Sequence, residues 1–169
     1  HISYRDPKGS LLLCYNKYIM IRELVKPEHQ LFHHRIESCS YKLDRQFLAN
    51  TLVENMIHYK GIGISAIQVG VPVRVFLAGD PEELFVNPKI TYLSSYKKKN
   101  WEGCLSCPNV NVQVPRSHKI RLTYTTLREG KEILVKDREF KYFDAFVVQH
   151  ELDHLNGILI EDRGKAYTP

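Results

Sequence analysis

The pattern H-E-x-x-H at residues 150–154 constrains this chain more than any other feature of its sequence. Residues four apart on a helix project from one face, so a helix here directs two imidazole rings toward a single ion. Helical spacing of apolar residues from about Phe143 to Leu155, followed by Asn156 and Gly157, predicts such a helix. Glu151 comes directly after the first histidine, where a carboxylate can reach a water molecule on the ion. The segment therefore predicts a metal site carried by a helix.

A catalytic ion of this kind usually takes three protein ligands and keeps one position open for water, so His150 and His154 need a third partner. Too few residues follow His154 for a further helix that carries a ligand. Ile160 stands where one class of metalloprotease has a third histidine. We therefore expect the third ligand upstream. Cys104, in a strand-rich segment, is the best candidate, because a thiolate binds soft and borderline metals well.

Two alternatives to this ligand set stay open. Glu161 or Asp162 could supply a carboxylate, although acids beside Arg163 are more often exposed surface groups. Cys104 and Cys107 could instead join the two histidines in a closed, structural Cys₂His₂ zinc site. The residues inside and after the cysteine pair do not suit a zinc knuckle, and positions three apart in an extended strand point to opposite faces. We therefore favour the open, catalytic site.

The pattern along the chain predicts an α+β fold, with antiparallel β-sheets packed around the central C-terminal H-E-x-x-H helix and with an N-terminal helix. Apolar residues at helical spacing predict the N-terminal helix from Tyr41 to Lys60, with Ser40 as its N-cap and Gly61 as its terminator. Short β-rich runs, separated by Gly, Pro, Asn and charged residues, predict the strands. The expected strands are Val73–Leu77, Leu84–Val86, Val110–Val114, Lys119–Leu127, Glu132–Val135 and a last short one at Ile158–Ile160.

Composition narrows the class of protein. A chain of 169 residues that is 43% hydrophobic can bury one compact core, so we expect a single domain. No run approaches the ~20 apolar residues needed to span a bilayer, so we expect no membrane partner. Four cysteines without the spacing of a disulfide framework favour a reducing compartment, either a cytoplasm of the bacterial type or the interior of an organelle.

Charge gives weaker guidance. A net charge of +5 favours a weak attraction to anionic surfaces such as RNA, but ordinary solubilising charge explains it as well. The run Lys97–Lys99 is expected to be a solvated loop tip rather than a binding patch. Arg116 is expected either to pair with Glu102 and steady the strand that carries the third ligand, or to be solvated.

Three separated segments resemble, as a set, the signature motifs of the peptide deformylase family. They are G-I-G-I-S-A-I-Q at residues 61–68, E-G-C-L-S at residues 102–106 and Q-H-E-L-D-H-L-N-G at residues 149–157. Their order and spacing also suit that family, and the resemblance extends from Met20 to about Arg163. It implies that residues 20–169 form a single deformylase-like catalytic domain. Residues 1–19 are then expected to be an extension or a tag-like segment.

The resemblance implies an activity. A metal-dependent hydrolase of this family removes the N-formyl group from formyl-methionine at the amino terminus of nascent polypeptides and releases formate. The implied cofactor is one divalent metal ion, Fe(II) in the first place, while Zn, Ni or Co suit the same ligands. Glu151 would move the protons, and the side chain of Gln68 and the backbone N–H of Leu105 would stabilise the oxyanion. The metal ligands would be Cys104, His150 and His154.

By analogy with the family, five residues would line an apolar recess for the first side chain of the peptide: Ile62, Gly63, Phe143, Phe146 and Val147. The larger members of this set could equally be ordinary core residues. Tyr142 and Asp144 differ from the family, which commonly has Gly and an apolar residue there. These departures leave the strictness of the methionine preference open.

N-formylated nascent peptides are the expected partners, with the ribosome surface as a further expectation, and DNA is not expected. Two other interpretations stay open. An endopeptidase could use the same H-E-x-x-H helix, although its third ligand is poorly provided for. A deformylase-like scaffold without activity could bind metal or ribosomal RNA through its basic surface.

Overall fold

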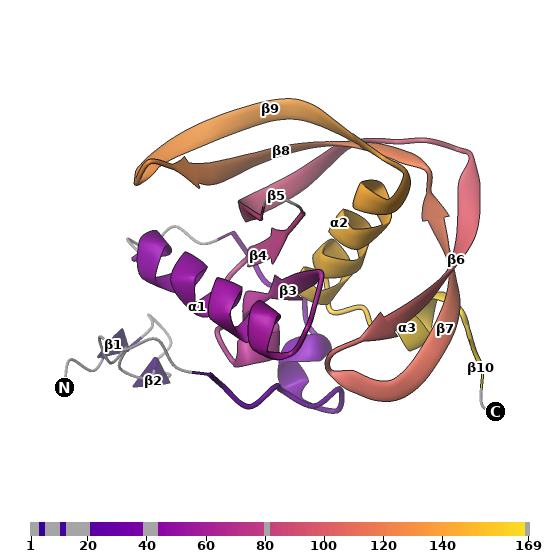
Figure 1. The fold of residues 1–169 in the computed structure, drawn as a ribbon, viewed down its shortest axis with the longest axis horizontal. Coiled ribbons are helices and arrows are strands. Elements are labelled where there is room, and N and C mark those ends of the chain that lie inside the picture. Colours follow the sequence, from indigo (N-terminus) through magenta and orange to yellow (C-terminus); the bar gives the residue numbers. More distant parts are fainter. Residues whose placement is uncertain (1–3, 6–10, 13–20, 39–43, 80–81, 168–169) are drawn as a thin grey trace.

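The computed structural model describes residues 4–5, 11–12, 21–38, 44–79 and 82–167. Within them the fold is α+β, which confirms the predicted class: antiparallel strands surround a central helix, α2 (Tyr142–Leu155) (Figure 1). A second long helix, α1 (Arg45–His58), packs against β3 (Gly63–Ser65) and β4 (Val75–Ala78). The shorter helices are η1 (Gln30–Phe32), η2 (Ala66–Val69) and α3 (Ile160–Arg163). No helix in this part of the chain is long and apolar enough to cross a membrane.

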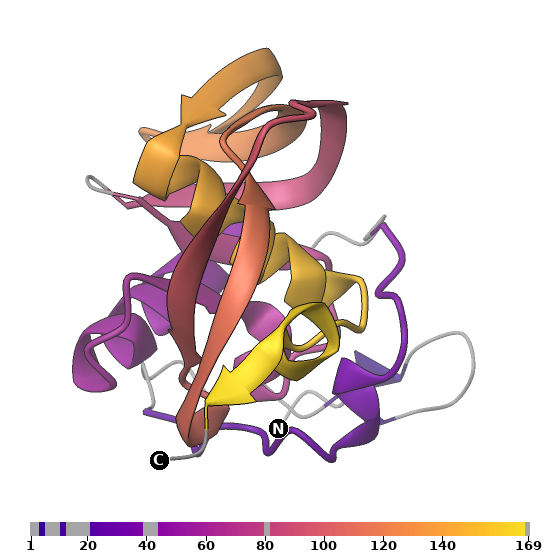
Figure 2. The ribbon, with the colours of Figure 1, turned by 90° about the vertical axis from the view of Figure 1, so that its right-hand side faces the viewer.

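The strands form antiparallel sheets with orders β3-β4-β5-β8-β9, β10-β7-β6 and β1-β2. The long hairpin of β6 and β7 runs across α2 (Figure 2), while β3 and β4 contact α2 from the larger sheet. The central helix is therefore held between two sheets. The strand bounds are β1 (Tyr4–Arg5), β2 (Leu11–Leu12), β3 (Gly63–Ser65), β4 (Val75–Ala78), β5 (Glu83–Leu93), β6 (Lys97–Cys104), β7 (Cys107–Ser117), β8 (Lys119–Arg128), β9 (Lys131–Lys141) and β10 (Lys165–Tyr167).

Both ends of α1 differ from the prediction. Asp44 is the N-cap, and its carboxylate accepts a hydrogen bond of 2.9 Å from the backbone N–H of the third helical residue. The predicted N-cap, Ser40, lies outside the described residues. At the other end, Lys60 adopts the left-handed conformation with φ 56, so the helix terminates one residue before the predicted Gly61. Backbone hydrogen bonds rather than residue type decide this position, because they close a Schellman motif around Lys60.

Two further stretches correct the sequence prediction. Lys97–Lys99 is exposed, as expected, but it begins strand β6 instead of forming a loop, because its backbone pairs with β7 up to Ser117. Ile158–Ile160 is not a strand. Ile160 begins α3, because Asp162 Oδ2 accepts a hydrogen bond of 2.8 Å from the backbone N–H of Leu159 and thereby caps a short helix.

Helix α2 is buried over most of its surface. Ala145–Val148 and Glu151–Leu155 are buried, although this stretch includes the polar residues Glu151, Asp153 and His154. Buried polar and charged groups are costly unless they are hydrogen-bonded, paired or bound to a ligand. The polar face of α2 is therefore where the functional site is to be sought.

Two glycines with equal φ allow a test of how tightly the end of α2 is packed. Gly157 follows α2 with φ +72, and a Cβ added there would lie 2.8 Å from the backbone nitrogen of His34. Gly130, between β8 and β9, has the same φ of +72, but no atom lies within 4 Å of a Cβ added there. Gly130→Ala should lower the free energy of unfolding by about 1–2 kcal/mol, the cost of a left-handed alanine. Gly157→Ala should cost about 1–3 kcal/mol more, because the His34 backbone must shift. Urea unfolding measures both, and equal losses would contradict this packing.

Candidate metal centre and substrate cavity

Three side chains with metal-ligating atoms meet where the end of β6 crosses α2. Ligand atoms of Cys104, His150 and His154 all lie within 4.8 Å of one another, and Cys104 Sγ is 3.3 Å from His154 Nε2. Cys104 and His154 are buried, with exposed fractions of 8% and 1%. The structure thus brings together the three residues that the sequence singled out as ligands.

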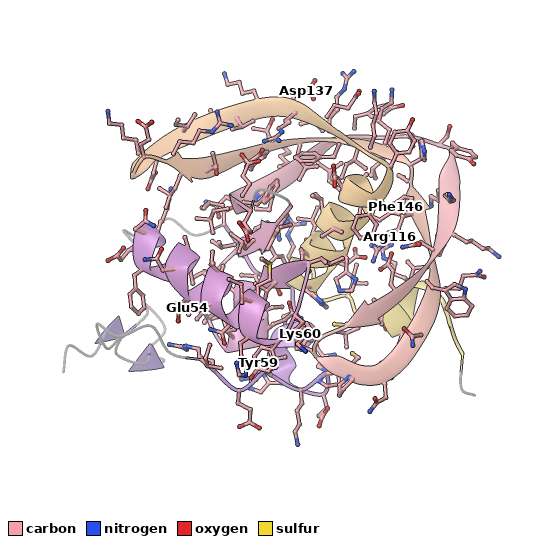
Figure 3. All side chains as sticks on the ribbon, viewed as in Figure 1. Glu54, Tyr59, Lys60, Arg116, Asp137 and Phe146 are labelled. Carbon is pink, nitrogen blue, oxygen red and sulfur yellow. The ribbon has the colours of Figure 1, made fainter. Side chains whose placement is uncertain are left out.

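A buried ion-pair network holds β6 and β7 against α2. Arg116 of β7, labelled in Figure 3, donates hydrogen bonds to both carboxylate oxygens of Glu102 at 2.9 and 2.8 Å, and also to Asp153 of α2. Arg163 pairs with the same aspartate at 2.6 Å. The expected pairing of Arg116 with Glu102 is confirmed, and Asp153 is a functional neighbour that the sequence did not single out. This network sets where the strand and the helix meet.

Glu102 also orients the first histidine. Its Oε2 lies 3.0 Å from His150 Nδ1, so Nε2 remains the ring nitrogen available to a metal. Burial raises the pKa of the Glu102 carboxyl, but hydrogen bonds from Arg116 and His150 outweigh burial and leave this pKa below its ordinary value. Burial, together with the nearby charges of His150 and Arg116, lowers the pKa of His154 well below its ordinary value. A neutral imidazole has a free lone pair for a cation, so this donor set fits a metal ion.

Glu151 lies beside these ligands, deep in the protein. It is 4% exposed, and its Oε2 has no hydrogen-bond partner among the residues that the structure describes. Burial raises the pKa of its carboxyl to about 7, against the opposing effects of His150 and Arg116. A Cβ on Gly63 would lie 2.8 Å from Glu151 Oε1, so only glycine leaves room for the carboxylate. A buried carboxylate with a pKa near neutrality suits proton transfer.

Gln68, in the short helix η2, also lies close to the centre. Its Oε1 accepts a hydrogen bond of 2.9 Å from the backbone N–H of Ser65, which leaves its Nε2 facing the cysteine, 3.8 Å from Cys104 Sγ. A second donor to Gln68 Oε1 is the Ser65 hydroxyl at 3.1 Å. Leu105 follows Cys104 in the turn between β6 and β7 and packs close to Gly61. Gln68 and Leu105, the two residues expected to supply oxyanion donors, both line the cavity at this centre.

A cavity of about 410 Å³ opens onto this centre. Phe146 and Val147 are buried in its wall, while Ile62 and Phe143 are more than half exposed at its mouth, so Phe143 is not a core residue. All five residues expected for the substrate recess line the cavity. Lining residues that the sequence analysis missed are Lys60, Asn100 and Trp101, which flank the first two motifs and carry no pattern of their own.

The alternative ligands do not belong to the ligand cluster, although the thiol of Cys107 contacts that of Cys104. Within the described ranges, the cluster of potential ligands consists of Cys104 and the two histidines, without Cys107, Glu161 or Asp162. Cys107 faces Cys104 directly across a two-residue turn, and both thiols are free. The expectation that positions 104 and 107 lie in one extended strand was therefore wrong, because the chain reverses between them. The geometry nevertheless favours a three-ligand site with an open side toward the cavity.

The fold and the centre define a class: a hydrolase with an H-E-x-x-H helix and a cysteine as third potential metal ligand. The family model described as polypeptide deformylase matches residues 21–168. A peptide deformylase of Bartonella tribocorum is 36% identical over 152 residues, which is 85% of this chain and 78% of the relative.

Solved structures agree with these matches. The crystal structure of the peptide deformylase of Thermotoga maritima has a TM-score of 0.78 and 30% sequence identity, and covers 86% of this chain and 99% of that one. A Met-Ala-Ser-bound class I type b peptide deformylase of Acinetobacter baumannii has a TM-score of 0.77, 30% identity and the same coverage. The chain belongs to the peptide deformylase family, whose members are metal-dependent hydrolases that remove the N-formyl group from nascent polypeptides.

The buried network makes a quantitative prediction. Arg116→Met leaves the carboxylates of Glu102 and Asp153 buried without their shared cation, so it should lower the free energy of unfolding by about 3–5 kcal/mol. Arg121→Met is the control, since Arg121 also pairs with two carboxylates but is 44% exposed, and it should cost less than about 1 kcal/mol. Urea unfolding at neutral pH distinguishes the two. Similar losses for both variants would show that the network does not hold the hairpin on α2.

Proposed function

We propose that this chain hydrolyses the formyl amide at the amino terminus of nascent polypeptides at the centre formed by Cys104, His150 and His154. The observation that carries the proposal is the buried carboxylate of Glu151 beside three side chains suited to a metal ion, with one oxygen that has no hydrogen-bond partner in the described part of the chain. Buried polar atoms almost always have a partner, so this oxygen points to a bound reactant. Family membership supports the same reaction.

The donor set supports one divalent metal ion. A thiolate and two imidazoles suit borderline metals, so we propose Fe(II) as the ion in vivo, while Zn, Ni or Co would be accepted by the same ligands. Such an ion supplies Lewis acidity and makes water acidic enough to ionise near neutral pH. The chain contributes the open side of the centre, because no fourth potential ligand among the described residues joins the three on the side toward the cavity.

Glu151 is proposed as the group that moves the protons. Its carboxylate would accept a proton from the attacking water and deliver it to the amine that leaves as the amide bond breaks. A pKa of about 7 supports this role, because a group that must both take and give a proton works best near the ambient pH. The close approach of Gly63 restricts where the carboxylate can lie.

Gln68 and Leu105 are proposed to stabilise the oxyanion that forms at the formyl carbon. The Gln68 amide is oriented by the hydrogen bonds from Ser65, so its Nε2 is directed at the centre before substrate arrives. The backbone N–H of Leu105 is the second proposed donor. Donors oriented in advance in a buried site lower the barrier more than mobile ones do.

The cavity is proposed to hold the first side chain of the peptide. Its buried wall at Phe146 and Val147 is apolar and suits the unbranched side chain of methionine. Ile62, Gly63 and Phe143 would flank the peptide nearer the mouth. The Acinetobacter relative that binds Met-Ala-Ser supports a peptide that continues beyond its first residue.

The ribosome surface is proposed as a second partner, because the net charge of +5 favours weak association with RNA. We propose the bacterial-type cytoplasm or the interior of an organelle as the location. Free thiols at Cys104 and Cys107 support a reducing compartment.

Replacing Glu151 tests the proposed chemistry. Glu151→Ala should bind about one metal ion per chain, yet release formate from formyl-Met-Ala-Ser about 10²–10⁴-fold more slowly, because no other described side chain is placed to transfer the proton. Metal analysis and a formate assay measure the two properties. Near-normal turnover would exclude Glu151 from the mechanism. A longer, unformylated peptide serves as the protease control, and its cleavage by the wild type would favour an endopeptidase instead.

A further inference from the structure

Lys60 places a positive charge at the mouth of the substrate cavity. It lies just beyond the C-terminal end of α1, beside the tip of the β6–β7 hairpin, and its side chain is exposed (Figure 3). The other charged residues that line the cavity are Glu102, His150 and Glu151, which belong to the centre itself. No ion pair joins Lys60 to a carboxylate of the described residues. Its charge is therefore available to whatever enters or leaves the cavity.

The backbone at Lys60 is unusual for a lysine. Its φ of 56 is left-handed, and two hydrogen bonds close a Schellman motif, from Lys60 N to Ile57 O at 3.1 Å and from Gly61 N to Met56 O at 2.8 Å. Helices usually end with glycine or asparagine at this position, and Gly157 fills the same position after α2. A long cationic side chain is thus kept where a smaller residue fits the backbone better. Such outliers gather at ligand-binding sites.

The rest of the mouth does not neutralise this charge. Asn100 and Trp101, on the opposite wall, are uncharged, and Glu102 further in is already paired with Arg116 and His150. With the formyl group at the metal centre and the first side chain against Phe146, the following residues of a peptide must leave through this mouth. The residues that line the cavity there include Lys60 and, from β6, Asn100 and Trp101, so these are the side chains that the peptide would meet.

We propose that Lys60 is a specificity determinant that favours formylated peptides with acidic side chains directly after the first residue. The inference rests on the proposed function and adds a substrate preference to it. Opposite unit charges about 5 Å apart in water attract enough to change a rate constant roughly fourfold, and a like charge has the opposite effect. An acidic peptide should therefore exceed a basic one by roughly 15-fold in kcat/KM, and salt should reduce the difference.

The test compares formyl-Met-Asp-Asp, formyl-Met-Asn-Asn and formyl-Met-Lys-Lys, all with amidated C-termini, on the metal-loaded enzyme. The wild type should rank them in that order by kcat/KM. Lys60→Asn suits the left-handed backbone and removes the charge, so its ratio of acidic to neutral peptide should fall close to one. Lys60→Glu should invert the order. Because the acidic and the neutral peptide are assayed with the same variant, any general loss of activity cancels in the ratio of their kcat/KM values.

Lys136→Glu is the matched control, since it makes the same change in net charge at an exposed position of β9 that does not line the cavity. It should leave the wild-type ratio in place. The inference is overturned if Lys60→Glu keeps the acidic preference, if Lys136→Glu shifts it equally, or if the wild type shows no preference. Failure to release formate from any of the peptides would instead overturn the proposed function.

Discussion

The contact between Arg116 and the two carboxylates of Glu102 and Asp153 is the constraint on which the site depends. It joins both strands of a hairpin to a helix that is distant in sequence: β6 supplies Glu102, β7 supplies Arg116 and α2 supplies Asp153. Cys104 lies two residues beyond Glu102, and the carboxylate of Glu102 also orients the ring of His150. Holding one ion pair in place therefore aligns a cysteine and two histidines at once, and burial makes that pairing obligatory, since an unpaired charge there would be costly.

The sequence predicted the parts of this molecule that follow a local period. Spacing alone predicted helix α2 and its two histidines. Cys104 was expected as a ligand because a catalytic ion usually needs a third protein ligand, and this ligand was expected upstream of His154. The motifs around Gln68 and Cys104 indicated a protein family only when they were considered together with the H-E-x-x-H motif. The prediction of helix α2 is confirmed, because helical spacing places side chains on one face regardless of the rest of the fold.

Other features depend on tertiary contacts and left no local signal. Lys97–Lys99 has the composition of a loop, but pairing of its backbone with β7 makes it a strand. Lys60 follows α1 in a left-handed conformation that favours glycine. Ile160 begins a short helix instead of ending a strand, because the carboxylate of Asp162 accepts a hydrogen bond from the backbone N–H of Leu159. Asn100 and Trp101 line the cavity only because the hairpin brings them opposite α2. The sequence alone could therefore indicate the catalytic chemistry more readily than the shape of the cavity mouth.

The central claim is that Cys104, and not its neighbour Cys107, completes a metal centre with the two histidines. Substituting the protein with Co(II) tests it most directly, because a thiolate on cobalt gives a ligand-to-metal charge-transfer absorption that imidazole and carboxylate ligands lack. The wild type and Cys107→Ala should both show this absorption, and Cys104→Ala should lose it. Persistence of the absorption in Cys104→Ala, or its loss only in Cys107→Ala, would contradict the account.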